Sequence, residues 1–375
     1  MAQFPYNEII TLDGAAPRHD LAESTGPNLR LDDLLGQAAI GDLALGYGTP
    51  EGDERLRQEI ADQHGVGPED VVITVGGMHA LFLLAFILCE RGDEAVTTAP
   101  LFPLARNVLE AVGARLSILP LAFDRGYRPD LAELRALLSP KTRLVSLASP
   151  QNPSGVALPQ DMLRTILAMM AEICPAAYLL VDETYRDAAY GDDPLAPTTV
   201  TLGPRVISVA SLSKCHGAPG LRLGWAITRD PALRAQLVLG KFNTVISCST
   251  IDEALALRLL AERERIIGER RRHLAEGLRR TEAWVQENAG FVDWVRPDAG
   301  AICCVRLKPA VFDAAAVARF LEVQAGADVR TGKGSWFGEE DRVFRLGFGL
   351  LALPELDAAL AALATALRRA LPEAA

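Results

Sequence analysis

The sequence lacks the features that mark zinc proteins, disulfide-rich proteins and nucleic-acid-binding proteins. It has 375 residues, and its six cysteines are scattered, with no CxxC pair among them. We therefore expect no metal site and no disulfide framework, and this cysteine usage fits a reducing cytoplasm. The net charge of −10 also argues against nucleic acid as a partner, because binding to phosphates requires a basic surface.

Segments that carry a protein to or through a membrane are missing as well. The sequence starts without a basic stretch followed by an apolar one, so we expect no signal peptide. The longest apolar runs, such as residues 80–89, are shorter than the roughly 20 residues that a membrane-spanning helix needs. The resulting expectation is a cytoplasmic protein with no membrane partner.

Short apolar runs that alternate with helical stretches dominate the sequence from residue 71 onward. The runs are apolar on both faces and are predicted as strands at residues 71–75, 94–98, 115–121, 143–148, 178–181, 206–209 and 223–228. Such strands, separated by helices, are typical of a mostly parallel sheet between two helical layers. The predicted fold class is α/β: a three-layer α/β/α large domain with a mostly parallel seven-stranded sheet, plus a smaller α+β domain.

Helix breakers indicate where the large domain ends. A long helical region at about residues 251–287 is followed by Gly290 and Pro297, and two further strands then alternate with helices. We assign residues 46–288 to the large domain, and residues 1–45 and 289–375 to an N-terminal arm and the small domain. The arm, with a short helix expected near residues 31–39, is predicted to pack on the small domain.

The stretch with the clearest chemical content follows the strand at residues 206–209. It reads Ser-Leu-Ser-Lys-Cys-His-Gly-Ala-Pro-Gly-Leu-Arg and holds Ser211, Ser213, Lys214 and Arg222. A lysine amine can form a Schiff base with an aldehyde, and an arginine with a serine hydroxyl can bind a phosphate. The stretch therefore predicts a site for an aldehyde cofactor that carries a phosphate. A surface loop with ordinary charges is the alternative.

Two earlier strand ends carry residues that suit the same ligand. Gly76, Gly77 and Met78 follow the strand at residues 71–75 and open a helix, whose free backbone N–H groups can bind a phosphate. Phe102 follows the next strand and could stack on a flat ring. An ordinary strand-to-helix turn and a core phenylalanine are the respective alternatives.

Later strand ends add polar groups, and ligands of such sheets bind outside the carboxyl ends of the strands. Asn152 stands between prolines that favour extended backbone, which would hold its amide forward as a donor. Asp182 could keep a ring nitrogen protonated, and Tyr185 could reach an oxygen of the ring. Arg345 lies in an apolar strand and needs an anion, which a substrate carboxylate would supply. A turn, a helix cap and a structural salt bridge are the alternatives.

The order and spacing of these pieces resemble the class I/II aminotransferases, fold type I enzymes that use pyridoxal 5′-phosphate (PLP). The resemblance runs from about Tyr47 to the end of the sequence. It implies Lys214 as the lysine that forms the Schiff base and Asp182 as the partner of the pyridine nitrogen. It also implies Asn152 and Tyr185 as partners of the 3′-oxygen. The expected catalytic residues are thus Lys214, Asp182 and Tyr185.

Other residues implied by the resemblance bind the ring, the phosphate and the substrate. Phe102 would stack on the ring. The phosphate would be surrounded by Gly76, Gly77, Met78, Ser211, Ser213 and Arg222. Arg345 would bind the α-carboxylate, with Asn152 and Gly26 as further substrate-binding residues. Tyr47 matches the tyrosine that such enzymes lend to the phosphate of a neighbouring subunit, which implies a homodimer with shared active sites.

Three departures from the family pattern bear on the substrate. His216 stands where related enzymes often carry an aromatic residue, and its role is open. Residues 242–250 hold no arginine, so a dicarboxylic substrate is not favoured. The Ser-Thr-Gly at residues 24–26 is similar to a smaller group of PLP enzymes that includes capreomycidine synthase, which cyclises a hydroxylated arginine.

The expected function is a PLP-dependent aminotransferase that moves an amino group from an L-amino acid to a 2-oxo acid through a Schiff base at Lys214. A PLP-dependent lyase or cyclase of the same fold, acting on a modified amino acid, stays open as the alternative. A PLP-binding regulator of DNA is disfavoured, because no basic N-terminal module is present.

Overall fold

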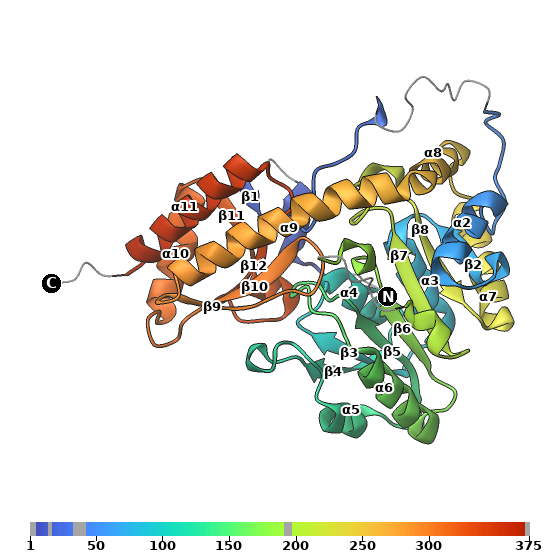
Figure 1. Ribbon diagram of the computed structural model, residues 1–375. Helices are drawn as coiled ribbons and strands as arrows, with labels where there is room; N and C mark the ends of the chain where they lie inside the picture. Colours follow the sequence, from blue (N-terminus) through green and yellow to red (C-terminus); the bar gives the residue numbers. More distant parts are fainter. Residues whose placement is uncertain (1–4, 14–16, 33–42, 191–196, 372–375) are drawn as a thin grey trace.

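The computed structural model describes residues 5–13, 17–32, 43–190 and 197–371 of the chain. A larger body with a seven-stranded sheet and a smaller body with a five-stranded sheet are joined by the long helix α9 (Arg263–Glu287), which runs from one to the other (Figure 1). The helix expected near residues 31–39 falls largely outside the described residues.

The sheet of the larger body has the strand order β2-β8-β7-β6-β5-β3-β4. Its strands are β2 (Val71–Thr74), β3 (Glu94–Ala99), β4 (Arg115–Pro120), β5 (Thr142–Ala148), β6 (Tyr178–Asp182), β7 (Val206–Ser211) and β8 (Gly224–Thr228). Neighbouring strands are parallel except where β8 pairs with β2 and β7. The predicted α/β class and the mostly parallel seven-stranded sheet are therefore confirmed.

Helices cover both faces of this sheet, which explains why most of its strands are rich in buried apolar residues. One face packs against α3 (Gly76–Leu88), α4 (Pro103–Ala111) and α7 (Pro231–Val245). The other face packs against α2 (Glu54–His64), α5 (Leu131–Leu137), α6 (Gln160–Ile173) and α8 (Thr250–Ala261). Side chains alternate between the two cores, as Val72 and its neighbours Val71 and Ile73 do in β2.

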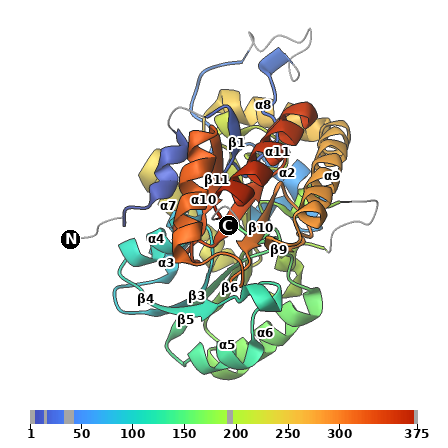
Figure 2. The ribbon, with the colours of Figure 1, turned by 90° about the vertical axis from the view of Figure 1, so that its left-hand side faces the viewer.

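The smaller sheet has the order β1-β11-β12-β10-β9. Its strands are β1 (His19–Leu21), β9 (Val292–Val295), β10 (Ile302–Leu307), β11 (Val329–Lys333) and β12 (Val343–Gly347). Strand β1 comes from the N-terminal arm and pairs in parallel with β11, while the other pairs are antiparallel. Helices α10 (Ala314–Gly326) and α11 (Leu353–Arg369) cover the side of this sheet that faces away from the large body (Figure 2).

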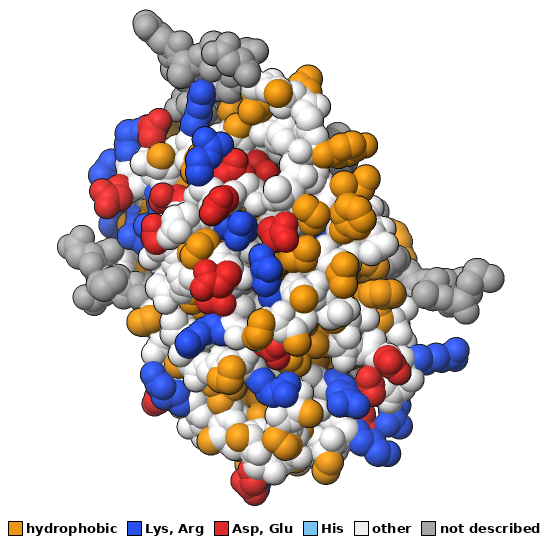
Figure 3. Space-filling model, turned by 90° about the vertical axis from the view of Figure 1, so that its right-hand side faces the viewer, with side chains coloured by type: hydrophobic (Ala, Val, Ile, Leu, Met, Phe, Trp, Pro, Cys, Tyr) orange, Lys and Arg blue, Asp and Glu red, His pale blue; other side chains and the backbone are white. Residues whose placement is uncertain are grey.

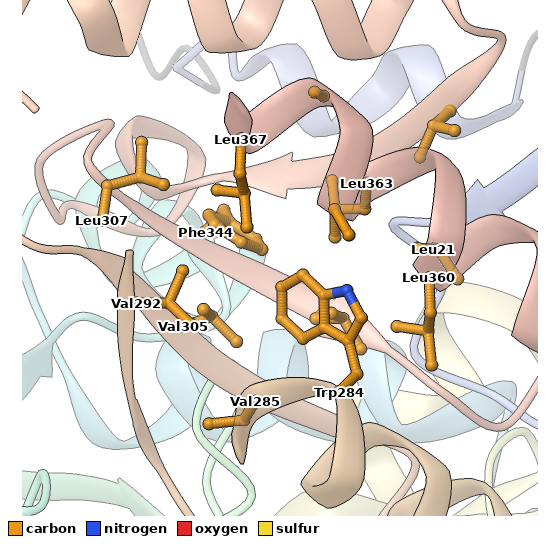
Figure 4. Packing of buried hydrophobic residues seen from close by; sticks show 14 of the residues in the cluster. Leu21, Trp284, Val285, Val292, Val305, Leu307, Phe344, Leu360, Leu363 and Leu367 are labelled. Atoms are coloured by element: carbon orange, nitrogen blue, oxygen red, sulfur yellow. The ribbon is translucent and has the colours of Figure 1, made fainter. Parts of the chain in front are cut away.

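Helix α9 belongs to both cores. Near its start, Ile266 packs with the large-domain core formed by α2, β2 and α8. Near its end, Trp284 and Val285 pack with Leu360 and Leu363 of α11 in the small-domain core (Figure 4). The division of the chain at residues 46 and 288 therefore stays a prediction, because no single break in packing marks it.

The predicted helical region at residues 251–287 is two helices rather than one. Helix α8 ends and α9 begins at Glu262, whose φ and ψ of −98° and 14° lie outside the helical range. No glycine or proline occurs there, so the sequence carries no local signal for the break. Within the described part of the chain, every helix is too short or too polar to cross a membrane.

Candidate functional site

The carboxyl ends of the parallel strands open into two neighbouring cavities that share Met78, Phe102 and Lys214 in their walls. The first cavity is lined by most of the residues predicted to hold the cofactor: Gly77, Met78, Phe102, Asn152, Asp182, Tyr185, Ser211, Ser213, Lys214 and Arg222. Sequence-distant strand ends meet here because parallel strands place their carboxyl ends along one edge of the sheet.

Lys214 lies in the loop after β7, at the junction of the two cavities. Its Nζ donates a hydrogen bond of 3.1 Å to Oγ of Ser24 in the N-terminal arm. Burial lowers the pKa of Lys214, and the negative charge of Glu23 partly opposes this shift. A lowered pKa increases the fraction of neutral amine, which is the form that acts as a nucleophile or a base.

The amino end of helix α3 faces Arg222 across the cavity wall. Gly76 has a φ of 71°, and a Cβ at this position would stand 2.5 Å from Nη2 of Arg222. Glycine therefore lets the guanidinium approach the helix terminus, where backbone N–H groups also point outward. Two serine hydroxyls, Ser211 and Ser213, line the same end of the cavity. This set of donors fits a phosphate group.

Asp182 ends strand β6 and faces the cavity. Its Oδ1 accepts a hydrogen bond of 3.0 Å from the backbone N–H of Thr184, but the predicted alternative of a helix cap is not seen, because the next helix (Arg186–Ala188) has Tyr185 as its N-cap. Burial raises the pKa of Asp182, and within the described residues it forms no ion pair. A protonated ring nitrogen beside it would offset that burial and favour the carboxylate.

The hydroxyl of Tyr185 is buried and has no hydrogen-bond partner of normal geometry in the described part of the chain. Such a group normally has a partner, so its position favours a ligand oxygen nearby. Phe102 adds an aromatic ring to the same wall. A buried carboxylate, an unpartnered hydroxyl and a flat aromatic side chain together fit the substituted pyridine ring of PLP.

Arg345 lies on β12 and is 1% exposed. Its Nη1 donates to Oδ1 of Asn152 at 2.9 Å, and its Nη2 donates to the carbonyl oxygen of Ala22. Its Nε has no hydrogen-bond partner in the part of the chain that the structure describes. Among the described residues, no carboxylate forms an ion pair with it, so the predicted alternative of a structural salt bridge is not seen there. A buried guanidinium without an acid is costly, and a substrate carboxylate would offset that cost.

Two predicted site residues lie away from these cavities. Tyr47 is 86% exposed and contributes to neither wall. Gly26 lines a separate surface depression, where a Cβ would meet Nη2 of Arg270 at 2.9 Å. The roles predicted for Tyr47 and Gly26 therefore stay predictions.

The sequence analysis missed the two arm residues closest to the lysine, Glu23 and Ser24, which line the second cavity. Their sequence context gave little signal, because they follow a strand of only three residues in an arm where polar residues are common. Arg270 was also missed: it donates to the carbonyl oxygens of Cys215 and Pro27 at 2.8 and 2.5 Å. This arginine joins the lysine loop to the arm.

His216 does not line either cavity. It is buried, its Nε2 lies 3.9 Å from Oδ2 of Asp187, and burial lowers its pKa to about 4. The ring is therefore neutral near pH 7 and packs behind the lysine loop rather than beside the ligand.

Comparison with known proteins places these features in context. The chain matches the family described as aminotransferase class I and II over residues 17–363. Capreomycidine synthase of Streptomyces vinaceus is 33% identical over 331 residues, which cover 88% of this chain and 83% of that protein.

Two solved structures are similar along almost the whole chain. A PLP-dependent aminotransferase from Streptococcus suis 89-1591 has a TM-score of 0.86 at 26% identity, covering 96% of this chain and 95% of the other. The PLP-dependent cyclase OrfR, solved in complex with Au, has a TM-score of 0.85 at 25% identity and covers 98% of both chains. Similar proteins thus include both an aminotransferase and a cyclase.

Proposed function

Because the chain belongs to the class I and II aminotransferase family, we propose that Lys214 holds PLP covalently while an amino group moves from an L-amino acid to a 2-oxo acid. The observation that carries this proposal is the meeting of Lys214, Asp182 and Arg222 in one cavity. A lysine, a buried carboxylate and a phosphate-binding arginine are the groups that this cofactor requires of a protein.

The cavity residues orient the cofactor. Asp182 would hold a proton on the ring nitrogen, and Asn152 and Tyr185 would bind the ring oxygen. Phe102 would stack on the ring. The phosphate would be held by Gly76, Gly77, Met78, Ser211, Ser213 and Arg222. When bound, PLP supplies an acceptor for the electrons left at the substrate Cα, and the protein decides which bond to Cα is broken.

Arg345 binds the substrate carboxylate through two parallel hydrogen bonds, with Asn152 beside it. This contact would hold Cα next to Lys214, whose amine would act as the base that takes the proton from Cα. The lowered pKa of Lys214 suits this work, because a base acts best when its pKa is close to the working pH. The Oγ of Ser24 accepts a hydrogen bond of 3.1 Å from this amine and so helps to orient it.

The test is a single-turnover reaction of the reconstituted protein with a panel of L-amino acids. We expect one equivalent of 2-oxo acid and conversion of the cofactor to its amine form, followed by recovery of the aldehyde form when a 2-oxo acid is added. A panel in which no amino acid converts the cofactor would contradict the proposal.

The cyclase or lyase alternative has two observations in its favour: the 33% identity to capreomycidine synthase and the structural similarity to a PLP-dependent cyclase along 98% of the chain. The same single-turnover reaction separates the two functions. Ammonia or a cyclised product, with the cofactor unchanged at the end, would favour the alternative over transamination.

We also propose a homodimer in the cytoplasm, in which Tyr47 of each copy reaches the phosphate of the other. Exposed apolar side chains on α3 and in or just after α7 supply a surface for this contact: Phe86, Leu239, Phe242, Val245 and Ile246. Hydrophobic side chains gather on the face of the large domain that carries α7 (Figure 3). Such patches are typical of interfaces, and the free cysteines fit a reducing compartment.

Mixing two inactive variants tests the shared site. In a mixed dimer of Tyr47→Ala and Lys214→Ala, one site keeps both wild-type residues, so we expect part of the activity to return. Recovery should follow subunit exchange measured by native mass spectrometry. Exchange without any recovery would show that Tyr47 does not serve the other subunit.

A further inference from the structure

The N-terminal arm carries an acidic side chain into the cavity beside the lysine. Strand β1 joins the small sheet by pairing with β11, which brings Ala22, Glu23 and Ser24 over the end of the large sheet. Ala22 accepts a hydrogen bond from Arg345, and Ser24 accepts one from Lys214. Glu23 stands between these two residues and lines the same cavity of about 700 Å³.

The charged side chains of this cavity differ in whether the proposed function gives them a partner. Among the described residues of its wall, the charged ones are Lys214, Arg345 and Glu23. In the proposed function both cations are occupied, Lys214 by the cofactor and Arg345 by the substrate carboxylate. Glu23 has no ion-pair partner within the described ranges, and its Oε2 accepts only the backbone N–H of Ser24, at 3.3 Å.

The negative charge of Glu23 acts on both cations. It raises the pKa of Lys214 and of Arg345 against the effect of their burial. The carboxylate therefore lies close enough to the substrate position to interact with a group on the substrate. The rest of the wall offers apolar contacts from Met78 and Phe102, which suit a methylene chain.

We propose that Glu23 binds the cationic end of the amino donor, so that the enzyme prefers L-amino acids carrying a guanidinium or ammonium group on an aliphatic side chain. This inference rests on the proposed function, because it needs Arg345 and Lys214 to be occupied as described. A carboxylate at this position agrees with the expectation that a dicarboxylic donor is not favoured, because its second carboxylate would face Glu23 across the cavity.

Binding of unreactive analogues tests this assignment without turnover. The probes are 5-guanidinopentanoate and its neutral isostere 5-ureidopentanoate, which lack the α-amino group, titrated into the holoenzyme by calorimetry. A charge-assisted hydrogen bond predicts that the guanidino acid binds about 10- to 100-fold more tightly. In Glu23→Gln the two dissociation constants should become equal, with ureido binding unchanged.

Glu8→Gln is the matched control. Glu8 belongs to the same arm, but its carboxylate accepts hydrogen bonds from Lys333 and Trp336, both at 3.0 Å, and it does not line the cavity. This variant should keep the wild-type preference for the guanidino acid. Equal binding of the two probes by the wild type, or an unchanged preference in Glu23→Gln, would overturn the proposal.

Single-turnover rates separate this inference from the proposed function. L-arginine should convert the cofactor faster than L-citrulline at low concentration, and Glu23→Gln should remove most of that ratio. Conversion by neutral amino acids with no preference for arginine would overturn the role of Glu23 alone. Failure of every amino acid to convert the cofactor would instead overturn the proposed function.

Discussion

The two sides of the active-site cavity are built in different ways. The cofactor side comes from the large domain, where several strands are followed by polar residues such as Asp182 and Lys214. The substrate side comes from the arm and the small domain, where Ser24 and Arg345 reach the cavity from chain segments far apart in sequence. Ser24 contacts a lysine 190 residues away, and Arg345 contacts a residue 193 positions away.

The cofactor side and the substrate side therefore depend on different parts of the fold. Residues at parallel strand ends meet by the topology of the sheet alone, so the cofactor side depends on local sequence. The substrate side depends on the docking of β1 against β11 and of the small domain against the large one. Changes on the two sides should therefore have separable effects on cofactor binding and on substrate binding.

The largest effect is expected from Lys214→Ala. Loss of both the covalent attachment and the base should lower kcat by at least about 1,000-fold. Single-turnover absorbance of the reconstituted protein measures this loss. Lys141→Ala, at an exposed lysine outside the cavity, should leave the rate unchanged. Turnover retained in Lys214→Ala would contradict the assignment of Lys214 as the catalytic lysine of the large domain.

Arg345→Gln tests the substrate side of the cavity. Removing the cation that faces the substrate carboxylate should lower kcat/KM by about 100-fold, since one partner of a buried charged pair contributes about 2–5 kcal/mol. The affinity for PLP, measured by fluorescence titration, should stay within about threefold. A comparable loss of cofactor affinity would mean that the two sides are not separable.

Asp20→Asn tests the arm with a smaller change. The Asp20 carboxylate accepts hydrogen bonds from Nε and Nη2 of Arg330 in β11, at 3.3 and 2.5 Å, and so holds β1 on the sheet. Weakening this contact should raise the KM for the amino donor by about 10-fold and leave PLP affinity unchanged. Steady-state kinetics measure the first quantity. An unchanged KM would indicate that β1 docks without this ion pair.

The smallest effect concerns stability at acid pH and lies in the large domain. Burial lowers the pKa of His64 to about 3 and of His216 to about 4. Because an unfolded histidine has a pKa near 6.5, the unfolded chain takes up protons that the folded chain does not, and stability falls as the pH drops below about 6.5. At pH 5.5 each histidine should lower the free energy of unfolding by about 1.4 kcal/mol.

Denaturant unfolding at pH 7.5 and pH 5.5 measures this dependence. His216→Asn should reduce the difference between the two pH values by roughly half of what both histidines contribute. If the difference is the same in the variant and in the wild type, His216 takes up its proton in the folded state as easily as in the unfolded one.

Much of the large domain could be predicted from the sequence, but only two strands of the small sheet, β10 and β12, could be predicted. Strands β2 to β8 are apolar on both faces, which is the strongest strand signal, and each was predicted within a few residues. Strands β1, β9 and β11 were missed because they are short and half-polar, and β1 becomes a strand only by pairing with a segment more than 300 residues away. Pairing over such a distance leaves no local pattern.

The same division holds for individual site residues. Lys214, Asp182 and Arg222 were identified because the ends of parallel strands are where ligands bind, and a polar residue there stands out against an apolar run. Glu23 stands in an irregular arm, where polar residues are ordinary and carry no such contrast.

The sequence by itself determined the seven-stranded sheet between helical layers and pointed to most residues that line the first cavity, because hydrophobic periodicity and strand-end polarity are local properties of the chain. Only the tertiary structure brought the arm residues Glu23 and Ser24 into the second cavity beside Arg345 and Lys214. The contacts of Ala22 with Arg345 and of Ser24 with Lys214 depend on how two domains and an arm close around one cavity. Such contacts arise from the packing of the whole chain, so neighbouring residues do not encode them.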